Sequence, residues 1–221
     1  MGRPTDTSIV RDYCNANIGG IFDLNYLASE VFPDIPHVNM RKIATRLADA
    51  GLLRQISKGV YFIGESELSD EERIIKHYLF EGDIRVGMFT GKSLLFELGL
   101  TKQKPSLIEI KTNKTIGNKT IGNVDIKHTD SNFASGLAAC YEIQVAIELI
   151  INADYVDGDK TDELYQQISR HIRRYSDVGF KGLSIDYPRI VYIKLADLLN
   201  SMEISNRVME IYVEKSKLLS E

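Results

Sequence analysis

The sequence contains few of the residues that mark secreted, disulfide-bonded proteins. It has only two cysteines in 221 residues, Cys14 and Cys140, which lie far apart and in no C-x-x-C pair. Such sparse cysteines are typical of a reducing compartment, in which thiols stay unpaired. The first seven residues are polar and lack the apolar segment of a signal peptide. We therefore expect a cytoplasmic protein.

Long apolar runs are also missing. The longest, near residues 138–153, is interrupted by Glu142, Gln144 and Glu148. It is too short and too charged to span a bilayer, so we expect no membrane partner. The composition, with 43% hydrophobic and 26% charged residues, is that of an ordinary globular protein with room for one large or two small domains.

The motifs that would support nucleotide binding are incomplete. Gly91-Lys92-Ser93 resembles the end of a phosphate-binding loop, but Val86 stands where that loop needs its first glycine. Without that glycine the backbone amides do not wrap a phosphate. We expect instead that Thr90 caps a helix containing Lys92.

Catalytic and metal-binding patterns are equally weak. The sequence has no G-x-S-x-G segment, and its four histidines have neither helical metal-ligand spacing nor a cysteine nearby. The acidic residues between 154 and 163 lack the order of a calcium loop. We expect no catalytic residues, no metal and no cofactor, in a protein that is not an enzyme.

The first 65 residues have the pattern of a DNA-binding module. Apolar spacing predicts helices over residues 7–15, from Asp23 to about residue 31, and over 38–50. Two short β-prone runs, 52–56 and 59–63, come next and are joined by Ser57-Lys58. The order of helix, helix, turn, helix and hairpin is that of a winged helix-turn-helix.

The charge of this region differs from that of the chain. Residues 36–60 carry five cationic side chains against one carboxylate, Asp49, although the whole chain has a net charge of −4. A local cationic surface of this kind is typical of nucleic-acid contact, and Arg, Asn and Thr can read bases or bind phosphates. We therefore predict that double-stranded DNA is bound by His37, Asn39, Arg41, Lys42, Thr45, Arg46, Arg54 and Lys58. The alternative is a winged helix used only for protein contact.

The remaining residues predict a mixed second domain. Helices are expected over 69–81, with a Ser69–Glu72 capping box, and over 90–98, 132–152, 160–175 and 190–219 with a bend near 202–205. Strands are expected over 106–111 and 123–127. Between them the pentapeptide NKTIG occurs twice in tandem, at 113–117 and 118–122, and predicts a duplicated loop or hairpin. The fold class is thus α+β, with a winged helix-turn-helix domain at 1–65 and a mixed α/β, largely helical domain at 66–221.

Two stretches resemble a known family. The first includes residues 21–24, RKIATRLADAGLLR at 41–54 and KGVY at 58–61; the second includes GMFTGKSL at 87–94, LGLTKQKP at 98–105 and residues 109–113. Together they resemble the AbiEi antitoxins of bacterial type IV toxin–antitoxin systems, which are linked to phage abortive infection. The tandem repeat is not part of that resemblance.

The resemblance implies two activities. The N-terminal domain would bind the promoter of its own operon and repress it, and the C-terminal domain would counter a nucleotidyltransferase-like toxin without a stable complex. Two other hypotheses stay open. One is a one-component transcriptional regulator whose C-terminal domain senses a ligand in an apolar pocket. The other is an enzyme, such as a nuclease or nucleotide-binding protein, that uses Lys92 and the acidic cluster.

Overall fold

A computed structural model describes residues 5–133 and 138–218 of the chain. Helices and strands are mixed along it, which confirms the α+β class in its coarse form. The α-helices are α1 (Asp6–Ala16), α2 (Leu24–Tyr26), α3 (His37–Asp49), α4 (Asp70–Leu79), α5 (Gly91–Glu97), α6 (Ala138–Ile151), α7 (Thr161–Ile172), α8 (Asp177–Lys181), α9 (Arg189–Ser201) and α10 (Arg207–Leu218). The strands are β1 (Ile21–Asp23), β2 (Leu53–Ser57), β3 (Val60–Ile63), β4 (Phe80–Glu81), β5 (Ile84–Arg85), β6 (Gly87–Phe89), β7 (Ile108–Thr112), β8 (Lys119–Ile121) and β9 (Val124–His128).

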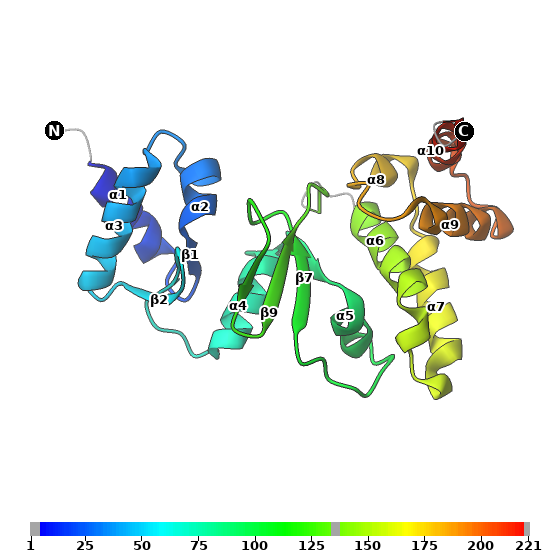
Figure 1. Cartoon of the computed structure of the whole chain (residues 1–221), viewed down its shortest axis with the longest axis horizontal. Coiled ribbons are helices and arrows are strands. Elements are labelled where there is room, and N and C mark those ends of the chain that lie inside the picture. The colour runs from blue at the N-terminus through cyan, green and yellow to red at the C-terminus, as the bar shows by residue number, and fades with distance from the viewer. Residues whose placement is uncertain (1–4, 134–137, 219–221) are drawn as a thin grey trace.

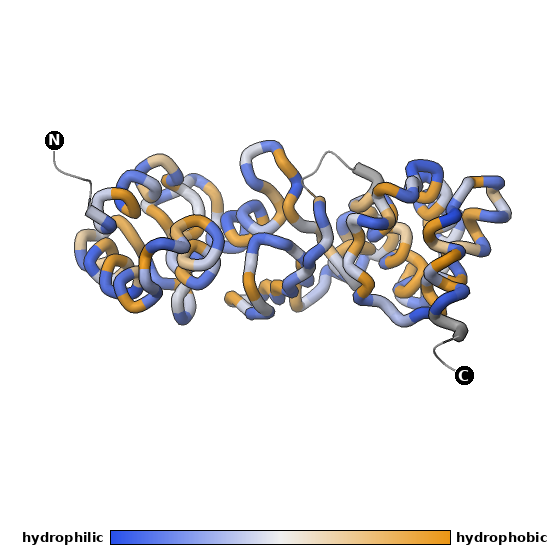
Figure 2. Tube along the Cα trace, turned by 90° about the horizontal axis from the view of Figure 1, so that it is seen from above, coloured by the Kyte–Doolittle hydropathy of each residue, from blue (hydrophilic) through white to orange (hydrophobic). Residues whose placement is uncertain are grey.

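These elements form three groups in a row, with the two ends of the chain at opposite ends of the row (Figure 1). The first group contains α1 to α3 and the first sheet, the second contains α4, α5 and the central sheet, and the third contains α6 to α10. The view from above shows the same row, with hydrophobic segments in each group (Figure 2). Within the described residues, no helix is both long and apolar enough to cross a membrane.

The N-terminal group has its own apolar core. Helix α3 contributes Met40, Ile43, Ala44 and Leu47, which are spaced along one face and are buried against α1, α2 and the hairpin of β2 and β3. Strand β1 joins that hairpin, so the sheet has the order β1-β3-β2 with both pairs antiparallel. The sheet thereby covers one side of the helices and fixes the direction of α3.

The central sheet has the order β6-β7-β9-β8. Strands β7 and β9 run parallel, and the other two pairs are antiparallel. Side chains alternate across a strand, so Ile108, Ile110, Val124 and Ile126 lie on one face, where they are buried with Tyr78 of α4. Helix α4 therefore covers that face and lies between the central sheet and the N-terminal group.

Arg73 of α4 ties the first two groups together. It is buried, and its guanidinium donates hydrogen bonds to the carbonyl oxygens of Gly19, Gly20, Ile63 and Gly64 at 3.0 to 3.4 Å. The guanidinium carbon of Arg73 also lies 4.0 Å from the centre of the Phe62 ring. Because Ile21, Val60 and Phe62 share a buried cluster with α4 and the central sheet, apolar packing continues across residue 65. The domain boundary predicted there stays a prediction.

Most predicted helices are present, with shifted ends. Asp23 caps α2, since its carboxylate accepts a hydrogen bond from the backbone of Tyr26, but the helix continues as the π-helical turn η1 (Leu27–Val31). The Ser69–Glu72 capping box of α4 is confirmed. For the helix predicted over 132–152, the structure shows α6 (Ala138–Ile151) and no helix at residues 132–133; residues 134–137 lie outside the described residues.

Several elements were not expected from the sequence. The short strands β1, β4, β5 and β6 have three residues or fewer each, too few to show an alternating pattern. The repeat predicted a duplicated loop or hairpin; its first copy is a loop and its second forms β8, which pairs with β9 as a hairpin. Two 3-10 turns, η2 (Ala153–Tyr155) and η3 (Gly158–Lys160), precede α7, and α8 lies between α7 and α9. The predicted bend in the C-terminal segment is confirmed, because residues 202–206 separate α9 from α10.

Candidate nucleic-acid interface

Helix α3 presents most of the predicted DNA-binding residues. Its inner face is fixed by the apolar core, so its other side chains point to solvent. His37, Asn39, Arg41, Lys42, Thr45 and Arg46 are all exposed on it. Among the described residues, no carboxylate forms an ion pair with Arg41, Lys42 or Arg46. The helix therefore offers cations that a polyanion could reach.

Two polar contacts fix side chains on this exposed face. The His37 ring Nε2 lies 2.9 Å from the side-chain oxygen of Asn25, which belongs to α2. Because that oxygen only accepts, Nε2 carries the proton in this contact. Thr45 donates its hydroxyl hydrogen to the carbonyl oxygen of Arg41 at 3.1 Å. Thr45 thus retains its oxygen lone pairs and its methyl group for a ligand.

A hollow lies between α3 and the start of α1. Thr5, Asp6 and Thr7 line one side, and Asn39, Lys42 and Arg46 line the other, with a volume of about 330 Å³. The hollow brings the first turn of α1 next to two cations of α3. Asp6 also lies in it, so the hollow contains charges of both signs.

The hairpin places its two predicted residues in different surroundings. Lys58 is exposed in the turn between β2 and β3. Arg54 of β2 instead pairs with Asp70 at 2.7 Å, and its guanidinium carbon lies 4.8 Å from the centre of the Phe62 ring. Arg54 also lines a hollow with α4 and the turn before β9 rather than with α3. Seven of the eight predicted residues thus lie on α3 or at the hairpin turn, and Arg54 lies apart.

Sequence reasoning missed the neighbours of Lys58. A small hollow there is lined by Asn25 and Lys58 of the N-terminal group and by Ile116, Gly117 and Asn118 of the tandem repeat. The repeat is about 60 residues away along the chain, so no local pattern could have placed it beside the hairpin. Its unusual sequence was the one signal that could have drawn attention to it.

A buried carboxylate joins the repeat to the N-terminal group. Asp23 is almost fully buried and forms an ion pair with Lys119. It also accepts a hydrogen bond from the hydroxyl of Tyr78 at 3.2 Å. Burial, with the nearby Asp23 charge, raises the pKa of Tyr78 well above its usual value, so this phenol stays protonated and donates. The cap of α2 is thereby tied to both α4 and β8.

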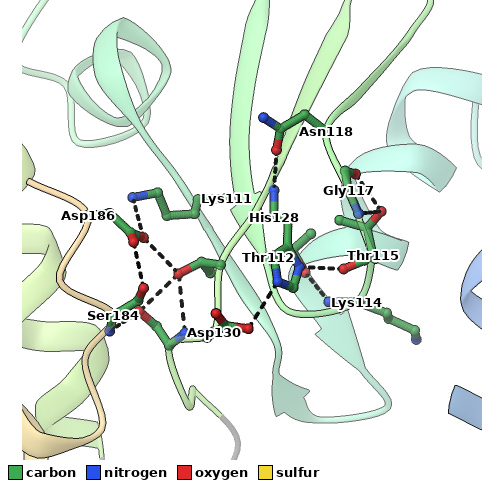
Figure 3. A network of polar contacts seen from close by, with 12 residues as sticks. Lys111, Thr112, Lys114, Thr115, Gly117, Asn118, His128, Asp130, Ser184 and Asp186 are labelled. Atoms are coloured by element: carbon green, nitrogen blue, oxygen red, sulfur yellow. Dashed lines mark hydrogen bonds and ion pairs between the residues drawn. The ribbon is translucent and has the colours of Figure 1, made fainter. Parts of the chain in front are cut away.

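A second polar network lies at the carboxyl ends of β7 and β9 (Figure 3). Asp186 accepts a hydrogen bond from Thr129 at 3.3 Å and pairs with Lys111 at 3.5 Å. Ser131 accepts from the backbone of Ser184 at 3.0 Å. These contacts attach β7 and the segment after β9 to the segment before α9.

The residues of the Gly91-Lys92-Ser93 motif, which resembles part of a phosphate-binding loop, make contacts within the chain. The backbone nitrogen of Gly91 donates to the carboxylate of Glu148 at 3.0 Å. Ser93 donates to the carbonyl of Leu107, and Lys92 lies 4.6 Å from the centre of the Tyr155 ring. A carboxylate in this position repels a phosphate. Thr90 stands at the cap position of α5, but its side chain makes no capping hydrogen bond.

The C-terminal group carries a second cationic surface. Tyr165, Gln166, Ser169, Arg170, Arg173 and Arg174 of α7 and the turn after it line a hollow of about 570 Å³. Arg174 pairs at 2.6 Å with Glu142, a buried carboxylate that also contacts His171. No group of three or more His, Cys, Asp or Glu residues that could hold a metal is found among the described residues. Burial raises the pKa of both Cys14 and Cys140 to about 11, which disfavours their reactive thiolate forms.

Comparisons with known proteins add little. No family model matches the sequence, and no curated protein matches it. Among solved structures, the RV2827C protein from Mycobacterium tuberculosis is similar over 90% of this chain and 77% of that one, with 16% identity and a TM-score of 0.38. A likeness at this level carries no argument about fold or function. The resemblance to the AbiEi antitoxins thus stays a prediction.

Proposed function

We propose that residues up to about 64 act as a winged helix-turn-helix that binds double-stranded DNA. In this proposal α3 enters the major groove and the β2–β3 hairpin is the wing. The observation that carries it is the division of α3 into an inner face buried in the core and an outer face with exposed Asn39, Arg41, Lys42, Thr45 and Arg46. A helix used only for packing has no need of three cations on its outer face that pair with no carboxylate of the described residues.

The resemblance to AbiEi antitoxins gives this DNA binding a biological setting. The chain would bind the promoter of its own operon, repress it, and counter a nucleotidyltransferase-like toxin encoded beside it. The alternative of a ligand-sensing regulator is less well supported, because the hollow beside α7 on the C-terminal group is bordered by three arginines and is open to solvent rather than an enclosed apolar pocket.

The DNA proposal is tested by titrating the full chain against its own upstream DNA and a scrambled duplex at two salt concentrations. The test variant is Arg41→Ala/Arg46→Ala. The matched control is Arg170→Ala/Arg173→Ala, in the last turn of α7 and just after it, which removes the same charge from a distant exposed surface. Each arginine that reads a base contributes about 1–3 kcal/mol, so the loss of both should lower specific affinity by at least about 30-fold, whereas the control should lose little.

Other results would overturn parts of the proposal. Equal, salt-sensitive binding to both duplexes means only electrostatic attraction and excludes a specific operator. No binding, or an equal loss in both double variants, excludes α3 as the reader.

The antitoxin activity needs a separate experiment. The full chain is co-expressed with the nucleotidyltransferase-like product of its own operon, and growth is measured. We expect rescue by the wild type and also by Arg41→Ala/Arg46→Ala, because countering the toxin is assigned to the C-terminal part. The absence of such a gene beside this one, or growth arrest despite the wild-type chain, would exclude the antitoxin function.

A further inference from the structure

The tandem repeat forms a well-defined loop that the proposed function does not yet use. Residues 113–117, the first copy, contain no strand, and the second copy forms β8. The Thr115 hydroxyl donates to the carbonyl oxygen of Gly117 at 2.9 Å. His128 of β9 holds the loop at two points, since its ring Nδ1 lies 2.5 Å from the Thr115 carbonyl and its backbone nitrogen donates to the Asn118 side chain at 2.8 Å (Figure 3).

This loop lies beside the proposed wing. Ile116, Gly117 and Asn118 line the same hollow as Lys58 at the hairpin turn and Asn25 of α2. Asn25 in turn contacts His37, the first residue of α3. A continuous surface therefore runs from the start of α3 through Asn25 and Lys58 to the repeat loop. A DNA duplex that touches both α3 and the wing passes close to this loop.

The loop also presents groups that suit a DNA backbone. Asn118 is exposed, and because its oxygen accepts from His128, its amide nitrogen is left as a donor (Figure 3). Asparagine side chains commonly donate to phosphate oxygens. Lys119 forms an ion pair with the buried Asp23, so residues 116–118 at the outer surface of the loop carry no charge. Ile116 is 48% exposed at its tip.

We propose that residues 116–118 form a second DNA-contact element next to the wing, in which Asn118 donates to a backbone phosphate. This inference rests on the proposed DNA binding. The loop is held in place before DNA arrives by His128 and by the ion pair of buried Lys114 with Glu81 at 3.4 Å. Little ordering is therefore needed on binding, which makes even a neutral contact effective. The repeat thus extends the contact with DNA to phosphates beyond the wing.

The test changes the charge at the loop tip in both directions. Ile116→Arg and Ile116→Glu are titrated with the upstream DNA, beside Ile211→Arg and Ile211→Glu as matched controls. Ile211 lies on α10 in the third group, at the far end of the row, and is 42% exposed (Figure 1). Because both positions are exposed, neither change should alter folding, which thermal melting checks.

We expect Ile116→Arg to tighten binding about 3- to 10-fold and to steepen the salt dependence by about 0.9 in log–log slope, as one added phosphate contact does. Ile116→Glu should weaken binding by a similar factor, and Asn118→Ala by about fivefold. The Ile211 variants should bind like the wild type.

The outcomes separate the two proposals. If the wild type binds its DNA and the Ile116 and Ile211 pairs behave alike, the loop does not contact DNA while the α3 proposal stands. If the wild type does not bind the upstream DNA, the proposed function and the loop's role are both overturned.

Discussion

The two copies of NKTIG have the same five residues but different structures. The first copy is a loop in which Ile116 is 48% exposed; the second forms β8 and the turn after it, and Ile121 is 2% exposed. The difference comes from the neighbouring segments of each copy. Residues 122–123 can turn the chain so that β8 pairs with β9, whereas the first copy comes directly after β7, whose two edges are already taken by β6 and β9. Available partners, rather than local propensity, decide which copy becomes a strand.

The largest predicted contrast is at the two isoleucines. Ile121→Ala removes a side chain that packs in the buried cluster with Tyr78 and Ile126, and should lower the free energy of unfolding by about 2–4 kcal/mol. Ile116→Ala removes an exposed side chain and should change it by less than about 0.5 kcal/mol. Urea unfolding of the two variants gives the comparison. Equal losses would mean that the copies do not differ in burial.

The second-largest difference in unfolding free energy is expected between the lysines of the two copies. Lys119→Met leaves the carboxylate of Asp23, which is 1% exposed, without its cation, and should cost about 2 kcal/mol because a buried charge loses its partner. Lys114→Met releases Glu81, whose side chain is 63% exposed and is solvated by water, and should cost less than about 1 kcal/mol. Thermal unfolding measures both.

A double variant checks the cause of the Lys119 effect. Asp23→Asn/Lys119→Met removes the charge as well as its partner, so the two changes together should cost less than the sum of the single changes. Additive losses would show that Lys119 stabilises the chain by packing alone.

The sequence predicted the elements whose signals are local. The apolar spacing of Met40, Ile43 and Leu47 predicted α3, and the Ser69–Glu72 capping box predicted the start of α4. The exposed candidate residues on α3 followed from the same periodicity. The short strands could not be predicted in this way, because each depends on a partner elsewhere in the chain. The identical copies show this limit most clearly, since no rule applied to five residues can give them different structures.

The candidate site could be predicted only in part for the same reason. The pairing of Arg54 with Asp70, the contact of His37 with Asn25 and the position of Asn118 beside Lys58 all join separate segments. Charge counting identified the cations but not which of them are already paired. Six predicted residues are exposed on α3 and Lys58 is exposed at the hairpin turn, whereas Arg54 of the same hairpin is already paired with Asp70 of α4.

A lysine from each copy lowers the pKa of the same buried histidine, His77, which predicts that the stability of the chain depends on pH. Burial lowers the pKa of His77 well below its usual value, and the charges of Lys114 and Lys119 lower it further. The folded chain therefore keeps His77 neutral while the unfolded chain takes up a proton below about pH 6.5. Stability present above that pH is lost as the pH falls, by up to about 1.4 kcal/mol per unit until the folded pKa is reached.

Three variants test this assignment by urea unfolding between pH 7.5 and 5. His77→Phe should remove the acid-dependent loss that the wild type shows. Lys114→Met should reduce the loss more than Lys119→Met does, because the charge of Lys114 lowers the pKa of His77 more strongly. An unchanged pH profile in His77→Phe would assign the loss to other groups.

The smallest contrast is at the two glycines, and it should change sign between the copies. Gly122 has φ +59°, a left-handed conformation that costs residues with a Cβ about 1 kcal/mol, so Gly122→Ala should destabilise the chain by that amount. Gly117 does not have a positive φ, and a Cβ added there meets no atom within 4 Å. Gly117→Ala should therefore stabilise the chain by up to about 0.5 kcal/mol, because alanine restricts the unfolded state.

Urea unfolding of the two variants beside the wild type measures the sign of each change. A loss of stability at Gly117 equal to that at Gly122 would show that both copies need the same glycine conformation. Glycine ends both copies, but only Gly122 has a left-handed conformation. Opposite signs would therefore show that the turn into β9, and not the repeat sequence, requires glycine.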